Sequence, residues 1–132
     1  MTALVLDTSA LMALLLEEPE AEDLLEQAAR ATALHLSAAS RLELTLVSEG
    51  NRIGAEASEV DQLLRSLAVG VVPFDQNQLH WALKGWRQFG KGRRQAGLNL
   101  GDCFSYGLAM TLDLPLLFKG EDFRSTDVKV AL

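Results

Sequence analysis

The chain has 132 residues, of which 48% are hydrophobic and 23% charged, a balance typical of one globular domain with a single core. No apolar stretch is long enough to span a membrane, and the N-terminal segment lacks the basic start and cleavage site of a signal peptide. The one cysteine, Cys103, excludes an internal disulfide and a cysteine-based zinc site. We therefore expect one domain over residues 1–132, located in the cytoplasm without membrane contact.

The formal net charge is −6, but the charges are unevenly distributed. Residues 1–75 carry 13 acidic and 4 basic side chains, whereas residues 76–101 carry 5 basic side chains and no acidic one. This asymmetry predicts an electropositive surface beside an acidic one. A solvated basic helix face explains the pattern equally well, so charge alone does not identify nucleic acid as a partner.

Short apolar runs alternate with amphipathic segments along the whole chain. The elements predicted in the first half are a strand over 3–6, a helix over 10–16 opened by Thr8 or Ser9, a helix over 19–30, a strand over 33–36 and a helix from Ser37 or Ser40 to about Gly50. Those predicted in the second half are a helix over 56–67, a strand over 70–74, a helix over 76–89 capped by Asp75, a glycine- and arginine-rich loop over 90–97, a helix entered through 99–102 and ending near Leu112, a strand over 115–118 and a weak strand over 128–130.

Strands that alternate with helices in this way predict βαβ units, and hence an α/β fold with a mostly parallel sheet covered by helices on both faces. In such sheets, ligands bind at the carboxyl ends of the strands. Asp7 and Asp122 each follow a predicted strand. We therefore expect both side chains at the functional edge of the sheet.

Four carboxylates come from separated points of the sequence that this fold brings together: Asp7, Glu43, Asp102 and Asp122. Two carboxylates about 4 Å apart repel by roughly 4 kcal/mol at an effective dielectric constant near 20, so a converging cluster needs protons or cations. Hard divalent ions such as Mg²⁺ and Mn²⁺ bind all-oxygen sites of this kind.

Each carboxylate also has a structural explanation. Asp7 and Asp102 are placed to cap or charge a helix N-terminus, although Asn99 could cap the second helix instead. Glu43 lies beside an apolar helix face and could pair with a distant arginine. Asp122 could be a turn residue, and Glu121 competes with it for the same role.

Four stretches of the sequence together resemble the PIN-domain ribonucleases, and among them the VapC toxins of type II toxin–antitoxin systems. The matching stretches are 6–11 (LDTSAL), 37–43 (SAASRLE), 97–106 (GLNLGDCFSY) and 117–123 (LFKGEDF). They occur in the family's order, and the resemblance covers essentially the whole chain. It implies a single PIN domain, with a central parallel sheet of about five strands between helices.

The resemblance also implies the residues of an active site. It places Asp7, Glu43, Asp102 and Asp122 on the acidic, metal-binding and catalytic quartet, with Ser9 as a supporting hydroxyl residue. The cofactor implied is Mg²⁺, for which Mn²⁺ can substitute. The partners implied are an RNA substrate, a VapB-type antitoxin and a second copy of the chain, in a homodimer or a toxin–antitoxin hetero-oligomer.

The mechanism that we predict is hydrolysis of RNA phosphodiester bonds by a metal-activated water, in which Asn99 and Ser105 support the acidic residues. Ser105, three residues after Asp102, is predicted to bind a phosphate oxygen or a metal-bound water. Lys91, Arg93 and Arg94 are predicted to hold RNA phosphates, without reading sequence.

Two alternatives to a metal-dependent ribonuclease remain open. A haloacid-dehalogenase-type phosphatase fits poorly, because it needs an aspartate where Ser9 stands. A non-catalytic PIN-like module that binds RNA or a protein partner through the same surface fits the sequence, and a measurement of activity distinguishes it.

Overall fold

The computed structural model describes residues 2–92 and 97–131. The strands are β1 (Leu4–Leu6), β2 (Leu34–Ser37), β3 (Val69–Val72) and β4 (Leu116–Leu117). The helices are α1 (Thr8–Leu15), α2 (Ala21–Arg30), α3 (Ala38–Glu49), α4 (Ala57–Ser66), α5 (Gln76–Phe89) and α6 (Leu100–Leu112). No helix within the described residues is long and apolar enough to cross a membrane.

The strands form one parallel sheet in the order β3-β2-β1-β4. The central strand β1 pairs on one side with β2 and on the other with β4, with Val5 opposite both His35 and Leu116. Its three side chains are all buried, because helices cover both faces of the sheet. The parallel α/β fold predicted from the sequence is confirmed.

The predicted fifth strand is reduced to a single bridge. Val130 pairs with Leu116 at one position only, so the sheet described here has four strands rather than about five. Val128 of the same segment is buried in the core, whereas Val130 is 38% exposed.

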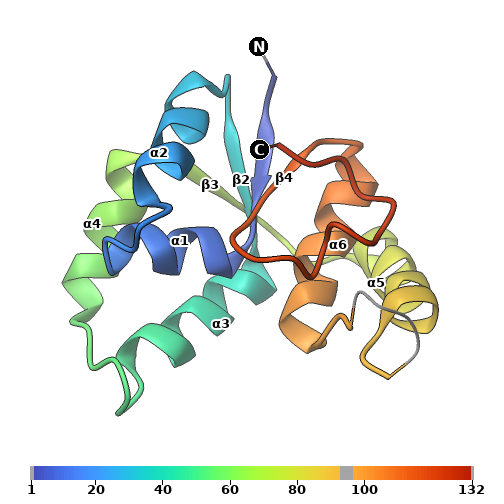
Figure 1. Ribbon diagram of the computed structural model, residues 1–132. Helices are drawn as coiled ribbons and strands as arrows, with labels where there is room; N and C mark the ends of the chain where they lie inside the picture. Colours follow the sequence, from blue (N-terminus) through green and yellow to red (C-terminus); the bar gives the residue numbers. More distant parts are fainter. Residues whose placement is uncertain (1, 93–96, 132) are drawn as a thin grey trace.

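The helices form two layers with the sheet between them (Figure 1). Helices α1, α2, α3 and α4 share one buried apolar cluster with the sheet, and α5 and α6 share a second with the C-terminal segment. At the amino end of the sheet, Thr2 accepts a backbone hydrogen bond from Thr32, and Ala131 donates one to Leu116 at the start of β4. The opposite edge, where β1 ends, is where α1 begins and where α3 and α6 contact each other.

The helix caps define this carboxyl edge. Asp7, rather than Thr8 or Ser9, caps α1, and Ser37 rather than Ser40 caps α3, because each accepts a backbone N–H two residues ahead. Asp75 caps α5 as predicted. Strands β1 and β2 are therefore each joined to the following helix through a single capping residue, which places the first turns of α1 and α3 directly at the strand ends.

Candidate acidic site at the carboxyl edge of the sheet

Asp7 lies at the end of β1 and is only 4% exposed. Its Oδ2 accepts a hydrogen bond from the Ser9 N–H at 3.0 Å, and its Oδ1 accepts one from the Ser105 hydroxyl at 2.5 Å. Burial raises the pKa of Asp7, and the hydrogen bonds from Ser105 and Ser9 partly offset this rise. Asp7 thus caps α1 through Oδ2, while its Oδ1 is hydrogen-bonded to Ser105 of α6.

Asp102 lies in the first turn of α6, where it forms a capping box with Asn99. The Asp102 N–H donates to the Asn99 side chain at 2.9 Å, and Asp102 Oδ2 accepts the Asn99 N–H at 3.0 Å. Burial, together with the charges of Asp7, Asp122 and Glu43, raises the pKa of Asp102 to about 7 against the opposing effect of the Asn99 hydrogen bond. Asp7, Glu43 and Asp122 therefore each lie within electrostatic range of Asp102.

Glu43 approaches this cluster from α3. Its own apolar neighbours do not bury it, because Leu46 is 66% and Val47 44% exposed. Its carboxylate instead lies against α6: a methyl group added to Gly101 would come within 1.6 Å of Glu43 Oε2. Partial burial and the Asp7 charge raise the pKa of Glu43, and a hydrogen bond with the Thr8 side chain offsets part of this rise.

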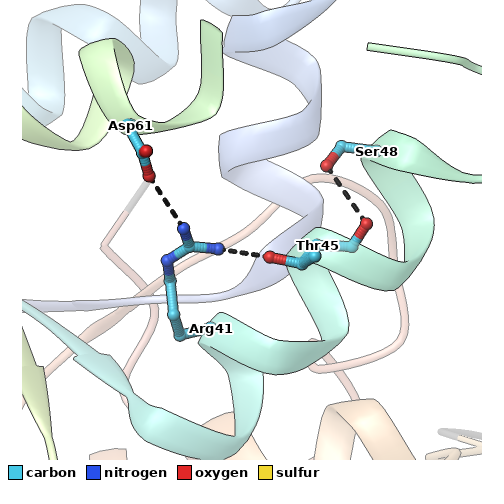
Figure 2. Close-up of polar contacts among 4 residues, drawn as sticks. All are labelled: Arg41, Thr45, Ser48 and Asp61. Atoms are coloured by element: carbon cyan, nitrogen blue, oxygen red, sulfur yellow. Dashed lines mark hydrogen bonds and ion pairs between the residues drawn. The ribbon is translucent and has the colours of Figure 1, made fainter. Parts of the chain in front are cut away.

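The nearest basic residue along α3 does not neutralise Glu43. Arg41 donates to Thr45 Oγ1 at 2.5 Å and pairs with Asp61 of α4 at 3.0 Å, as Figure 2 shows. In the part of the chain that the structure describes, no ion pair reaches Asp7, Glu43, Asp102 or Asp122. Among the residues that the structure describes, no arginine pairs with Glu43.

Asp122 lies in the exposed segment after β4. Glu121, its competitor, forms an ion pair with Arg124 at 3.3 Å, so it has a structural partner that Asp122 lacks. The same segment is fixed to α1 by the Lys119 N–H, which donates to Ser9 Oγ at 3.0 Å. The Lys119 ammonium also contacts Glu18 at 2.6 Å, which joins the segment to the end of α1.

The supporting residues occupy definite places. Ser9 links α1 to Lys119, and Asn99 caps α6. Ser105 is fully buried and directs its hydroxyl at Asp7 rather than outward, so it does not reach a phosphate or a solvent-exposed water. Being one helical turn after Asp102, it lies deeper in the fold, beneath the end of β1.

The predicted RNA contacts are only partly described. Lys91 is exposed, and its N–H donates to the Leu98 carbonyl at 2.9 Å, directly before the Asn99 cap. Arg93 and Arg94 lie outside the described residues.

Three residues of the site were not identified as site residues from the sequence. Thr8 lies beside Glu43, Ser40 Oγ lies 3.5 Å from Ser105 Oγ, and Gly101 makes room for the Glu43 carboxylate. Ser40 has a recognisable signal, since it precedes Glu43 by three residues and so shares its helix face. Gly101 has one too, since a glycine in the first turns of a helix needs a packing reason.

The donor set suits a hard cation in its chemistry, because it consists of carboxylate oxygens that lack a basic partner. Among the described residues, however, no three aspartate, glutamate, histidine or cysteine side chains converge as a set able to hold an ion. An ion here would depend on fewer protein ligands, completed by waters or substrate. This is the manner in which Mg²⁺ binds, since it dehydrates reluctantly and keeps several waters. The space left by Gly101 for Glu43 also fits such a site.

Comparison with known proteins identifies the family. The model of the PIN domain matches residues 4–129. Ribonuclease VapC30 of Mycobacterium tuberculosis is 48% identical over 126 residues, which cover 95% of each chain. Ribonuclease VapC of Mycolicibacterium smegmatis is 46% identical over 125 residues, covering 95% of this chain and 97% of the relative. The chain belongs to the PIN-domain family, among the VapC ribonucleases.

Solved structures agree with this membership at the level of the fold. A structure of VapBC2 from Rickettsia felis bound to a DNA fragment from its promoter superposes with a TM-score of 0.71 at 16% identity, covering 97% of this chain and 96% of that chain. A DNA-bound VapBC structure from Salmonella typhimurium gives a TM-score of 0.69 at 15% identity, covering 98% and 96%. The likeness in fold extends over nearly all of the chain.

Proposed function

We propose that this VapC-family chain is the ribonuclease toxin of a type II toxin–antitoxin system and that it hydrolyses RNA with a divalent cation at the acidic site, which Asp7 and Asp102 would bind directly and Glu43 and Asp122 through waters. The observation that carries the proposal is that Asp7, Glu43 and Asp122 all lie near enough to Asp102 for their charges to raise its pKa, while no basic side chain among the described residues pairs with any of the four. The ribonuclease names of relatives at 46–48% identity support it.

The four carboxylates differ in what they contribute. Asp7 and Asp102 each use one oxygen in a cap, so each keeps a second oxygen for the ion: Oδ1 of Asp7 beside Ser105, and Oδ1 of Asp102. Glu43 and Asp122 approach Asp102 from α3 and from the segment after β4. They complete the negative field and orient waters. Asp122, the most exposed of the four, is on the side open to substrate.

We assign Mg²⁺ as the ion, with Mn²⁺ as a substitute. When bound, the ion lowers the pKa of a coordinated water and offsets charge on the phosphate in the transition state. Asp7 and Asp102 would hold the ion, and its positive charge would offset the burial and repulsion that raise the pKa values of the carboxylates. Lys91, at the edge of the site, supplies positive charge toward the polyanionic substrate.

The decisive experiment compares purified, antitoxin-free protein with Asp102→Asn on total cellular RNA, in Mg²⁺, in Mn²⁺ and in EDTA. We expect discrete RNA ends only with wild-type protein and metal, and a loss of about 100-fold or more in the variant, because metal binding provides several kcal/mol of transition-state stabilisation. Equal RNA profiles for both proteins would leave the non-catalytic binding module as the function.

We also propose a VapB-type antitoxin as the partner. Neighbouring structures whose titles describe toxin–antitoxin or VapBC complexes support this assignment. Co-expression with the product of an adjacent small gene is expected to restore growth and to yield a co-purifying complex. Growth inhibition that no neighbouring gene relieves would contradict it.

A homodimer is proposed as well. An apolar hollow of about 430 Å³ lies between α5 and α6, lined by Phe74, Leu79, Ala82, Leu83, Trp86, Leu100, Cys103 and Phe104. Leu100 is 72% exposed there, an unusual position for a large apolar side chain unless another molecule covers it. We expect Leu100→Glu to convert the dimer to a monomer in light scattering; a wild-type protein that is already monomeric would refute the dimer.

A further inference from the structure

Ser105, Ser40 and Asp7 form a chain of polar contacts inside the fold. Ser105 Oγ lies 2.5 Å from Asp7 Oδ1, and Ser40 Oγ lies 3.5 Å from Ser105 Oγ. The three side chains come from α6, from α3 and from the end of β1. They connect the carboxylate at the centre of the site with both helices that flank it.

Because these three side chains are buried, the donor and the acceptor of each hydrogen bond between them can be assigned. Ser40 and Ser105 are both 0% exposed and Asp7 is 4% exposed, so bulk water does not compete for these hydrogen bonds. An ionised carboxylate only accepts hydrogen bonds, and a serine hydroxyl has one proton to donate. Ser105 therefore donates to Asp7, which leaves Ser40 as the donor to Ser105.

We propose that Ser105, supported by Ser40, is a positioning residue that fixes the orientation of the Asp7 carboxylate for metal binding. Ser105 holds Oδ1 and the Ser9 N–H holds Oδ2, so both oxygens of Asp7 are restrained. The carboxylate cannot rotate without losing one of these bonds. Each oxygen accepts one of these hydrogen bonds and so keeps acceptor capacity for an ion. This inference rests on the proposed metal site and assigns Ser105 and Ser40 a function in it.

The expected size of the effect follows from other metal sites, where loss of a residue that orients a ligand typically weakens metal affinity or activity by about 10–100-fold. Ser105→Ala would leave Asp7 Oδ1 without its donor and Ser40 without its acceptor. Ser40→Ala would remove only the outer bond, which is longer. We therefore expect a larger loss of affinity for Ser105→Ala than for Ser40→Ala.

Ser48 provides a matched control. It is also fully buried and lies on α3 two turns after Ser40, but its hydroxyl donates to the Thr45 carbonyl, away from the acidic site (Figure 2). Ser48→Ala removes the same atoms from the same helix. A general loss of packing would lower metal affinity alike in Ser48→Ala and Ser40→Ala. A positioning function would lower it only in Ser40→Ala and Ser105→Ala, which interrupt the hydrogen bonds that lead to Asp7.

The first measurement is the affinity for Mg²⁺ and Mn²⁺ by isothermal titration calorimetry on full-length protein, with thermal unfolding to verify that each variant is folded. We expect the dissociation constant to rise by about 10–100-fold for Ser105→Ala, to rise less for Ser40→Ala and to stay within about twofold of wild type for Ser48→Ala. Equal affinities for Ser105→Ala and wild type would overturn the proposal.

The second measurement needs no metal. The Ser9 N–H donates to the other oxygen of Asp7, so its hydrogen exchange, measured by NMR in EDTA, reports how firmly the carboxylate is held. We expect faster exchange in Ser105→Ala and unchanged exchange in Ser48→Ala; an unchanged rate in Ser105→Ala would contradict the positioning role. If wild type binds neither ion, the proposed metal site fails, while the exchange of Ser9 still decides whether Ser105 orients Asp7.

Discussion

The absence of a side chain at Gly101 leaves space that the acidic site uses. It is the second residue of α6, where alanine would favour the helix by up to about 1 kcal/mol. The Glu43 carboxylate, however, fills the space of the missing methyl group, since a Cβ on Gly101 would lie 1.6 Å from Oε2. The glycine therefore serves the acidic site at the expense of helix propensity.

Gly101→Ala is expected to reduce ribonuclease activity and to destabilise the protein, because either Glu43 or the first turn of α6 must move. In a Glu43→Ala background the same substitution is expected to be neutral or to stabilise by up to about 1 kcal/mol, since the clashing carboxylate is gone. Urea unfolding of the four proteins of this cycle measures the coupling. Equal effects of Gly101→Ala in both backgrounds would show that Glu43 does not occupy this space.

The pKa of Asp102 predicts how stability depends on pH in the absence of metal. Its pKa is about 7 in the folded protein against an ordinary value of 3.8, so between roughly pH 4 and 7 the folded state binds more protons than the unfolded state. Stability due to this group is complete below about pH 4 and is lost as the pH rises through 7. The raised pKa values of Asp7 and Glu43 act in the same direction.

We therefore expect the thermal unfolding midpoint in EDTA to be higher at pH 5 than at pH 7.5. Asp102→Asn should flatten this dependence, and Mg²⁺ should raise the midpoint more at pH 7.5, where the carboxylates are ionised. Scanning fluorimetry with these buffers provides the test. A midpoint in EDTA that rises from pH 5 to pH 7.5 would contradict the raised pKa.

How far the site could be predicted differs from residue to residue. Asp7 and Asp122 could be located from strand ends, because parallel strands end at one edge. The role of Ser105 could not, because helical spacing shows which residues share a face but not which neighbouring strand lies below it. Its contact with Asp7 joins residues 98 positions apart and exists only after α6 packs against β1.

At the scale of elements, helices were better predicted than strands. The bounds of α5 follow directly from Asp75 and Gly90, since capping residues lie next to the helices that they end. Strand β4 has only two residues where four were predicted, and the segment at Val130 forms one bridge. Strand length depends on a distant partner, which local composition does not contain.

The close packing of α5 on α6 depends on Gly85. A Cβ there would lie 2.5 Å from the Tyr106 ring, which is fully buried between the helices and donates from its hydroxyl to Asp127 at 2.8 Å. Gly85→Ala is expected to destabilise the protein by about 1–3 kcal/mol in urea unfolding, the usual effect of overpacking. Gly70→Ala is the control, because a methyl there meets only Leu34 O at 3.6 Å. Equal stabilities of the two variants would show that Tyr106 yields easily.

For the whole molecule, the charge asymmetry seen in the sequence persists in the fold. In the described part of the chain, five basic side chains form ion pairs: Arg30, Arg41, Lys119, Arg124 and Lys129. Along α5 and just after it, no described acid pairs with Lys84, Arg87 or Lys91, and Lys84 instead lies 5.0 Å from the Trp81 ring centre. Although the chain has a net negative charge, the surface of Lys84, Arg87 and Lys91 therefore carries positive charge that no described acid neutralises.

Of Lys84, Arg87 and Lys91, Lys91 is the residue whose backbone is hydrogen-bonded next to the acidic site. Its N–H binds the Leu98 carbonyl, and Asn99, the next residue, caps the helix that carries Asp102. We expect Lys91→Ala to weaken binding of single-stranded RNA severalfold and to reduce the slope of log affinity against log salt by about 1, the effect of losing one phosphate contact. Fluorescence anisotropy in an Asp7→Asn background, which is not expected to cleave the RNA, measures both quantities.

Arg65→Ala is the control, since Arg65 lies on α4, in the other helical layer, and also has no ion pair among the described residues. Equal salt slopes for the two variants would show that RNA approaches the site without Lys91.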